Sequence, residues 1–269
     1  MSEKVFINQV AIVTGGNSGI GKAVCLDLAR KGAKVMIIGR NQQKNEEVKR
    51  LIEEENGYAE AYSVDVSDKE SVYASVDKIF KKHGKVEILV CNAGSTTAPS
   101  LASKMPEEDW DGLLKTHLYG TFYFVKACGE RMKANKYGRI VLMSSLAGVW
   151  GLAANVSYGV AKTGLLGMTY TLAKEFGPYG ITVNAIQPGV IETPLTEEFV
   201  KIIREEILEN APIKKIGQPE DVAHAVNFFC LPQSEFLTGV TMKVDGGYIL
   251  NCGMDRMMMS FADQGVEYH

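Results

Sequence analysis

Short apolar runs rich in β-branched residues alternate with helical patterns along nearly the whole chain, and this alternation limits the possible folds. The runs that read as strands are Val10–Thr14, Lys34–Gly39, Ala59–Asp65, Ile88–Asn92, Arg139–Ser144, Thr182–Gln187 and Thr241–Val244. Several are continuously apolar, as expected of strands covered on both faces of a parallel sheet. Between the first two, Ile20, Val24 and Leu28 recur at helical spacing before Gly32. The alternation predicts a doubly wound α/β fold, with a mostly parallel seven-stranded sheet and helices on both faces.

The 269 residues suit one large α/β domain, and no linker, repeat or low-complexity tract divides them. Two segments look added to the core. The segment at about 193–216 contains an amphipathic pattern after a strand end, where lids occur in this architecture, although an ordinary surface helix has the same periodicity. The segment at about 249–269 contains four methionines between 254 and 259, which favours packing against a neighbouring subunit or a pocket wall.

Composition excludes several classes of function. A net charge of −3, with 46% hydrophobic and 23% charged residues, gives no sign of a nucleic-acid or membrane-binding surface. No apolar run is long enough to cross a membrane, and the first residues lack a secretory pattern, so we expect a cytoplasmic protein. Five scattered cysteines and four histidines show no disulfide framework and no metal-ligand spacing.

A glycine-rich turn follows the first expected strand and opens the first helix: Thr14-Gly-Gly-Asn-Ser-Gly-Ile-Gly21. Glycines at 15, 19 and 21 allow a sharp turn that brings backbone N–H groups close to a diphosphate at the helix amino terminus. In this strand–turn–helix context the pattern predicts a dinucleotide site. The alternative is a tight turn with no ligand.

The end of the second expected strand predicts the type of dinucleotide. NAD sites usually carry a carboxylate there, which accepts a hydrogen bond from the adenosine ribose. This chain has Gly39 followed by Arg40, so a 2′-phosphate meets no repulsion and can bind a guanidinium. We expect NADP(H) as the cofactor and NAD as the less favoured one; the alternative is a solvated arginine beside a permissive NAD site.

The strongest candidate for chemistry is the pair Tyr158 and Lys162, with Ser145 thirteen residues upstream. On a helix the pair lies one turn apart on one face. A neighbouring ammonium lowers the pKa of a phenol, and the Ser145 hydroxyl can hold a substrate oxygen beside it. This arrangement suits proton transfer to a ketone or from an alcohol, although helices at protein surfaces also carry Tyr/Lys pairs.

Taken together, these motifs resemble the short-chain dehydrogenase/reductase family, in its single-domain branch, from about Val10 to Tyr248. The resemblance rests on T-G-x-x-x-G-I-G at 14–21, Asp65-Val66, Asn92-Ala-Gly94, Ser145, Tyr158, Lys162, Asn184 and the segment Pro188–Thr193. It implies a Rossmann fold, Tyr158 as general acid/base, Lys162 and Ser145 as its catalytic partners, and a homodimer or homotetramer. The expected cofactor-binding residues are Gly15, Asn17, Ser18, Gly19, Ile20, Gly21, Arg40, Asp65, Val66, Asn92, Ala93, Gly94, Tyr158, Lys162, Gly189, Ile191 and Thr193.

One position departs from the family pattern. His117 stands where the family usually has an asparagine that supports a proton relay through water. An imidazole can keep such a relay and make it pH-sensitive, because it titrates near neutrality. The alternative, which we favour slightly, is a tolerated residue that fills space.

These observations predict an NADP(H)-dependent oxidoreductase that interconverts a secondary alcohol and a ketone. The apolar face around 199–207 and the Met-rich segment favour a bulky hydrophobic substrate such as a hydroxysteroid. Reduction of a 3-oxoacyl thioester is the alternative, weakened by Tyr179 where carrier-protein-dependent members have a basic residue. A non-catalytic NADP-binding protein, or an epimerase or dehydratase, fits less well.

Overall fold

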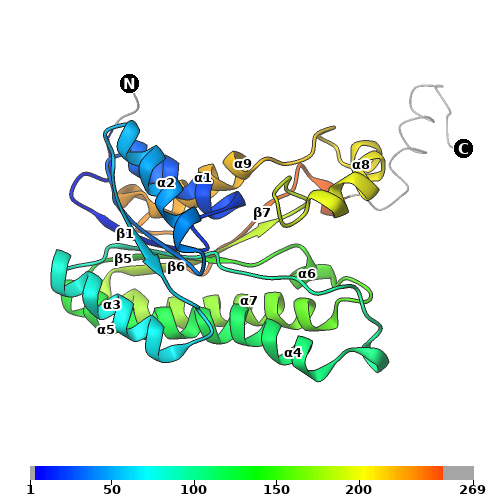
Figure 1. Cartoon of the computed structure of the whole chain (residues 1–269), viewed down its shortest axis with the longest axis horizontal. Coiled ribbons are helices and arrows are strands. Elements are labelled where there is room, and N and C mark those ends of the chain that lie inside the picture. Colours follow the sequence, from blue (N-terminus) through cyan, green and yellow to red (C-terminus); the bar gives the residue numbers. More distant parts are fainter. Residues whose placement is uncertain (1–3, 251–269) are drawn as a thin grey trace, which may run out of the picture.

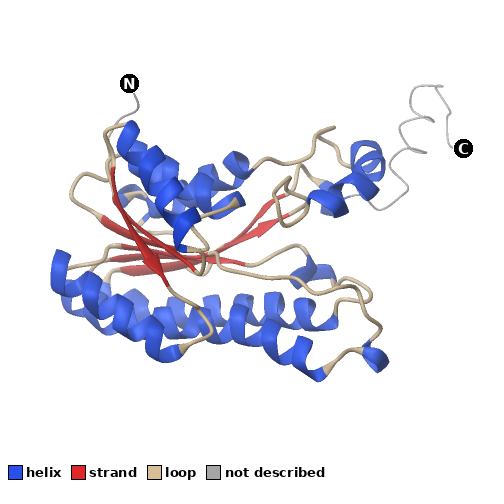
Figure 2. Ribbon diagram, in the orientation of Figure 1, coloured by secondary structure: helices blue, strands red, loops and turns tan. Residues whose placement is uncertain are grey.

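A single parallel sheet of seven strands forms the centre of the molecule, as the computed structural model shows for residues 4–250 (Figures 1 and 2). The strand order is β3-β2-β1-β4-β5-β6-β7, and every neighbouring pair is parallel. The strands are β1 (Val10–Thr14), β2 (Lys34–Gly39), β3 (Tyr58–Ser63), β4 (Ile88–Cys91), β5 (Gly138–Met143), β6 (Ile181–Pro188) and β7 (Thr241–Val244). The predicted doubly wound fold is confirmed.

Helices cover both faces of this sheet. One layer contains α1 (Gly19–Arg30), α2 (Gln42–Glu54) and α9 (Pro219–Cys230) (Figure 1). The other contains α3 (Lys69–His83), α4 (Glu107–Leu114), α5 (Gly120–Asn135) and α7 (Val156–Phe176), with the one-turn α6 (Ala147–Trp150) after β5. The central strands β1, β2, β4, β5 and β6 are therefore covered on both faces.

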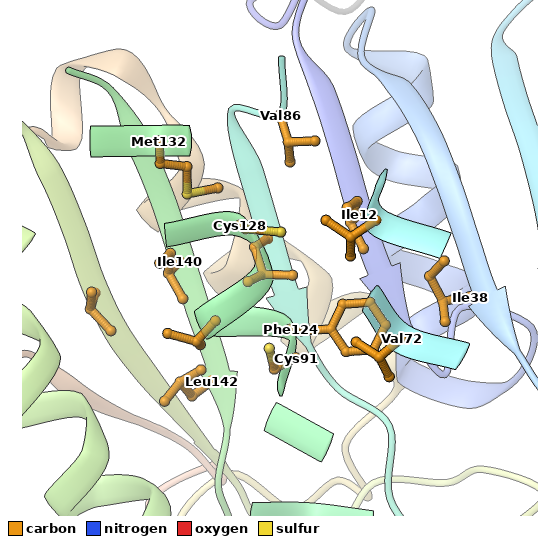
Figure 3. Packing of buried hydrophobic residues seen from close by; sticks show 14 of the residues in the cluster. Ile12, Ile38, Val72, Val86, Cys91, Phe124, Cys128, Met132, Ile140 and Leu142 are labelled. Atoms are coloured by element: carbon orange, nitrogen blue, oxygen red, sulfur yellow. The ribbon is translucent and has the colours of Figure 1, made fainter. Parts of the chain in front are cut away.

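Alternate residues of each strand enter two separate cores. Ile12 and Ile38 face the layer of α3, α5 and α7, where Phe124 and Val72 pack against them (Figure 3). Val13 and Ile37 face α1, α2 and α9. This two-sided burial explains why the central strands are continuously apolar.

The end of β6 leads into a segment that stands apart from both cores. It contains α8 (Glu197–Asn210), whose buried residues form a small cluster of their own with Ala211 and Ile216. Its two ends meet where Ile191 and Gly217 form an isolated parallel bridge. This loop and its helix lie within the segment at about 193–216 that the sequence marks as added to the core, and its role as a lid stays a prediction.

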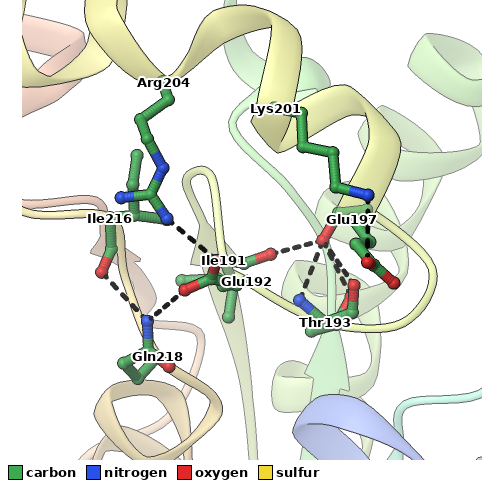
Figure 4. A network of polar contacts seen from close by, with 9 residues as sticks. Ile191, Glu192, Thr193, Glu197, Lys201, Arg204, Ile216 and Gln218 are labelled. Carbon is green, nitrogen blue, oxygen red and sulfur yellow. Dashed lines mark hydrogen bonds and ion pairs between the residues drawn. The ribbon is translucent and has the colours of Figure 1, made fainter.

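Polar contacts also stabilise the place where the two ends of this segment meet, which we call the neck of the α8 segment. Glu192 accepts hydrogen bonds from Arg204 at 2.9 Å and from the Gln218 amide at 3.0 Å (Figure 4). The hydroxyls of Thr193 and Thr196 form a 2.9 Å hydrogen bond, and the Thr196 hydroxyl also donates to the Ile191 carbonyl at 2.6 Å. The segment is thus attached at its base, while its outer face carries no further layer of described structure.

The differences from the expected elements are small. Four strands, β3, β4, β5 and β6, begin or end one or two residues from the expected positions, because the boundary depends on ladder hydrogen bonds that periodicity does not reveal. The four cysteines of residues 4–250 are buried and unbridged, as expected. The Met-rich segment and Cys252 lie outside the described residues.

Candidate active site

The predicted site residues come together at the carboxyl edge of the sheet. The glycine turn follows β1, Arg40 follows β2, and Asp65 follows β3; Asn92, Ser145 and Gly189 follow β4, β5 and β6. In open parallel sheets a ligand binds at this edge, where the strand order reverses direction. Here the reversal lies between β1 and β4.

The glycine turn forms a close-fitting cradle. Gly15 and Gly19 have φ angles of 62° and 48°, in the left-handed region that favours glycine. A Cβ on Gly21 would lie 2.1 Å from the Gly15 carbonyl oxygen, so the start of α1 excludes any side chain there. The turn therefore presents bare backbone at a helix amino terminus, and its residues fit a diphosphate.

Side chains from β1 and the loop after β4 hold this turn in place. The Thr14 hydroxyl accepts hydrogen bonds from the Asn92 and Ala93 amides at 3.0 and 2.9 Å. The Asn92 side-chain amide donates to the Thr14 and Gly15 carbonyls at 3.0 and 3.3 Å. The predicted residues of the two loops thus form one unit, which also includes Thr14, a residue that the sequence analysis did not assign to the site.

Thr193 lies over the same turn, since a Cβ on Gly19 would meet its side chain at 3.1 Å. Gly189 is equally confined, because a Cβ there would lie 2.8 Å from the Cβ of Asp245. Ile191 is buried at the neck of the α8 segment. The structure brings all three predicted residues to the β6 side of the cradle.

At the other end of the cradle, Arg40 is exposed beside the end of β2. Asp65 accepts hydrogen bonds from the Ser67 amide and hydroxyl at 2.9 and 2.7 Å. Burial raises the pKa of Asp65, but the Ser67 hydrogen bonds and the charge of Arg40 outweigh it and lower that pKa. A cation and an ionised acid therefore flank the expected adenosine position, and no carboxylate stands on β2 itself.

The candidate catalytic residues lie together between β5 and α7. The Lys162 ammonium lies 5.4 Å from the centroid of the Tyr158 ring and donates a 2.8 Å hydrogen bond to the Met143 carbonyl. The Ser145 hydroxyl lies near enough to Tyr158 to lower the pKa of the phenol. The predicted triad is thus assembled in space although thirteen residues separate its first two members.

The electrostatics of this group differ from the sequence-based expectation. Burial raises the pKa of Tyr158, and the nearby Ser145 hydroxyl offsets this only in part. Burial also lowers the pKa of Lys162 to about 7. The expected lowering of the phenol pKa by a lysine cation is not found in the protein alone, because both groups share one desolvated site and the lysine charge is itself disfavoured there.

His117 lies in the same cluster, in a turn of π-helix (Lys115–Tyr119) between α4 and α5. Its ring meets the Tyr158 ring edge-on, with centroids 5.7 Å apart. Nε2 lies 3.1 Å from the Ser95 amide nitrogen and 2.9 Å from the Ser95 carbonyl oxygen, whereas the buried Nδ1 has no partner among the described residues. Burial and the nearby Lys162 lower the pKa of His117 to about 3, so the ring is neutral at physiological pH.

Asn45 is a second residue at the cofactor site that the sequence analysis did not identify; it accepts a hydrogen bond from Asn17 in the glycine turn. It lies on the inner face of α2, three residues before the buried Val48, and is itself fully buried. An amide at a position where the helical pattern calls for an apolar residue was the signal that could have revealed it.

Within residues 4–250 no three His, Cys, Asp or Glu side chains are grouped so as to hold a metal ion. No helix in this part of the chain is long and apolar enough to span a membrane.

Comparison with known families places these features in context. Residues 15–249 match the family model described as enoyl-(acyl carrier protein) reductase. The chain is 35% identical over 242 residues to a 3-oxoacyl-[acyl-carrier-protein] reductase of Thermotoga maritima, covering 90% of this chain and 98% of the relative. It is 37% identical over 244 residues to the enzyme of the same name from Synechocystis, covering 90% and 97%.

Solved structures show the same fold with other named activities. An NAD⁺-bound xylitol dehydrogenase aligns with a TM-score of 0.87 at 30% identity, covering 90% of this chain and 99% of its own. A short-chain type dehydrogenase/reductase from Mycobacterium ulcerans aligns with a TM-score of 0.88 at 29% identity, covering 95% of each chain.

Proposed function

Since this chain belongs to the short-chain dehydrogenase/reductase family and is an NADP-dependent oxidoreductase acting on CH–OH groups, we propose that it reduces 3-oxoacyl thioesters to 3-hydroxyacyl thioesters. The relatives from Thermotoga maritima and Synechocystis support this choice, because they carry that activity in their names and align over nine-tenths of the chain. They give no support to the hydroxysteroid that the sequence analysis favoured.

Tyr179 lies far from the catalytic tyrosine of its own subunit, which weakens the case against a thioester substrate. Tyr179 belongs to a 3₁₀ turn (Gly177–Tyr179) after α7, next to the start of β6. Tyr158 lies at the opposite end of α7, and the rise of a helix over 18 residues separates Tyr158 from Phe176 by about 27 Å. A tyrosine at that distance does not line the mouth of the site in its own subunit.

Apolar side chains beside the site suit an acyl chain. Val149, Trp150 and Leu152 follow Ser145 and are exposed, and the Trp150 ring contacts that of Tyr248 with centroids 5.5 Å apart. On the α8 segment, the side chains of Leu195, Phe199 and Ile202 are also exposed. A ligand laid between them removes apolar surface from water, which stabilises binding by roughly 25 cal/mol per Å².

The assembled Ser145–Tyr158–Lys162 cluster is the observation that carries the chemistry. NADPH supplies the hydride when bound. Tyr158 then donates its proton to the ketone oxygen, which Ser145 orients through a hydrogen bond, and in the reverse direction the phenolate accepts the proton. The raised pKa of Tyr158 keeps the phenol protonated, as an acid requires.

The substrate is tested by following NADPH oxidation with 3-oxoacyl thioesters of several chain lengths, oxosteroids, small ketones and ketoses. We expect the highest kcat/KM with the thioesters. Turnover of oxosteroids or ketoses with no turnover of thioesters contradicts the proposal. Tyr158→Phe is the control for catalysis at this site, since it keeps the ring and removes the proton.

We also infer that the protein is a homodimer or homotetramer. Exposed aromatic and aliphatic side chains cover the outer face of α5 and α7, namely Phe122, Val160 and Tyr170, with Tyr119 beside them. Such a surface favours a partner subunit. Light scattering on the full chain measures the assembly, and a monomer at micromolar concentration contradicts the inference.

A further inference from the structure

A buried amide from α2 reaches the end of β2, and the catalytic proposal does not use it. The Asn45 side chain is fully buried, and its Nδ2 donates to the Gly39 carbonyl at 2.8 Å and to the Tyr62 carbonyl at 3.0 Å. Its Oδ1 accepts a 2.7 Å hydrogen bond from the Asn17 amide of the glycine turn. Asn45 thus links β2, β3 and the cofactor turn through one side chain.

This arrangement leaves no room for a side chain at position 39. A Cβ built on Gly39 would lie 2.4 Å from Asn17 Nδ2 and 2.7 Å from Asn45 Oδ1. Both distances are far below van der Waals contact, so one of the two amides has to move before any larger residue fits there.

The two amides differ in their freedom to move. Asn17 is partly exposed and is held by one short hydrogen bond, with a second contact of 3.4 Å to the Asn41 carbonyl. Asn45 is tied to two strand carbonyls, and moving it leaves buried polar groups without partners, which destabilises the protein. Asn45 is therefore the fixed obstacle and Asn17 the movable one.

The consequence concerns cofactor choice. An NAD site usually places a carboxylate at the end of this strand, where it accepts from the ribose 2′-hydroxyl. We propose that Asn45 is a specificity-determining residue for the cofactor, because its buried amide keeps position 39 a glycine and so excludes the carboxylate that NAD sites usually place there. Arg40, one residue further, then faces a 2′-phosphate with no competing acid on β2.

The proposal rests on NADP(H) use but not on the identity of the ketone. It is tested by direct titration of NADPH and NADH onto the full chain without any second substrate. The dissociation constants of wild type, Gly39→Asp, Asn45→Ala and Gly39→Asp/Asn45→Ala are compared. Gly39→Asp/Asn17→Ala is the matched control, because it removes the movable amide and leaves the fixed one; Asn17→Ala alone measures any direct contribution of Asn17 to cofactor binding, which is subtracted.

We expect Gly39→Asp to weaken NADPH binding without tightening NADH. Adding Asn45→Ala makes room for the carboxylate, and NADH affinity rises by about tenfold over Gly39→Asp, the effect of one charged hydrogen bond. Adding Asn17→Ala gives no such rise. Equal NADH affinity in Gly39→Asp and in the Asn45 double variant, or equal rescue by Asn17→Ala, overturns the proposal.

If a Gly39→Asp variant does not fold, Gly39→Ala tests the same steric exclusion, because it adds the Cβ without the charge. Gly39→Ala weakens NADPH binding in the wild-type background and not in the Asn45→Ala background. An identical loss in both backgrounds overturns the proposal. If the protein reduces no 3-oxoacyl thioester, the proposed substrate is rejected, and these cofactor-binding results still stand.

Discussion

The cofactor edge of the sheet and the α8 segment are built in contrasting ways. At the cofactor edge, the buried side chains of Thr14 and Asn45 and the partly buried Asn92 tie neighbouring loops and strand ends together over the two large cores. The α8 segment has a small apolar cluster of its own, a narrow neck at Ile191 and Gly217, and Ile202 exposed at 81%. One region is fixed by many crossing contacts, and the other by contacts concentrated at its base.

This difference assigns separate tasks to the two regions. A hydride donor and a proton donor have to be placed within a fraction of an ångström of the ketone, which favours rigid strand ends. A substrate wall tolerates local opening, and regions with few buried apolar contacts open at lower free energy than the core. We therefore propose that the fold combines a fixed reaction centre with an adaptable substrate wall, and the variants below probe that division in order of expected effect.

Tyr158→Phe tests whether the chemistry resides entirely at the fixed edge. Loss of the phenol proton removes general acid catalysis, and we expect kcat to fall by about 10²- to 10⁴-fold. NADPH affinity, measured by titration, should stay near the wild-type value because the ring remains in place. A variant that retains most of its turnover shows that another group donates the proton.

A matched pair of helix substitutions compares the packing of the two regions. Ile79 in α3 is fully buried in a main core and Ile207 in α8 is buried in the small cluster. Ile79→Ala should lower the global free energy of unfolding by about 2–5 kcal/mol. Ile207→Ala should lower it by less than half as much, while speeding amide exchange within Glu197–Asn210. Denaturant titration with hydrogen exchange measures both, and equal global losses contradict the comparison.

Lys162 makes the stability of the fixed edge depend on pH. Its pKa is lowered to about 7 in the folded protein, against the ordinary value of 10.5 in the unfolded chain. Between these values the unfolded state binds a proton that the folded state does not, so stability rises with pH. Lys162→Met should remove this rise. The difference in unfolding free energy between wild type and Lys162→Met, measured at pH 7 and pH 9, checks the sign, and a difference independent of pH contradicts it.

His117→Asn is expected to have the smallest effect. With its pKa near 3, His117 is neutral throughout the working range and adds no titration near neutrality. The shape of the pH–rate profile should therefore be the same in wild type and His117→Asn. A shifted limb in the variant shows that the imidazole takes part in proton transfer, as the sequence-based hypothesis of a pH-sensitive relay requires.

Patterns that depend on local chemistry could be read directly from the chain. Apolar runs gave the strands, because both faces of a parallel sheet are buried, and the glycines at 15, 19 and 21 marked a turn whose backbone excludes side chains. Tyr158 and Lys162 were paired because helical spacing fixes neighbours one turn apart. The proposed site at the strand ends follows from these short-range rules.

Other properties depend on which distant residues meet, and only the folded chain decides them. The pKa values of Tyr158 and Lys162 are set by burial, which periodicity does not report. Tyr179 looked relevant in sequence but lies beyond the far end of α7 from Tyr158. Asn45 is 28 residues from Asn17, and their hydrogen bond exists only because β2, β3 and the glycine turn converge. Sequence by itself determined the scaffold and the reacting groups. Tertiary packing determined the electrostatics of those groups and the space around them, because desolvation and steric exclusion come from neighbours that are remote along the chain.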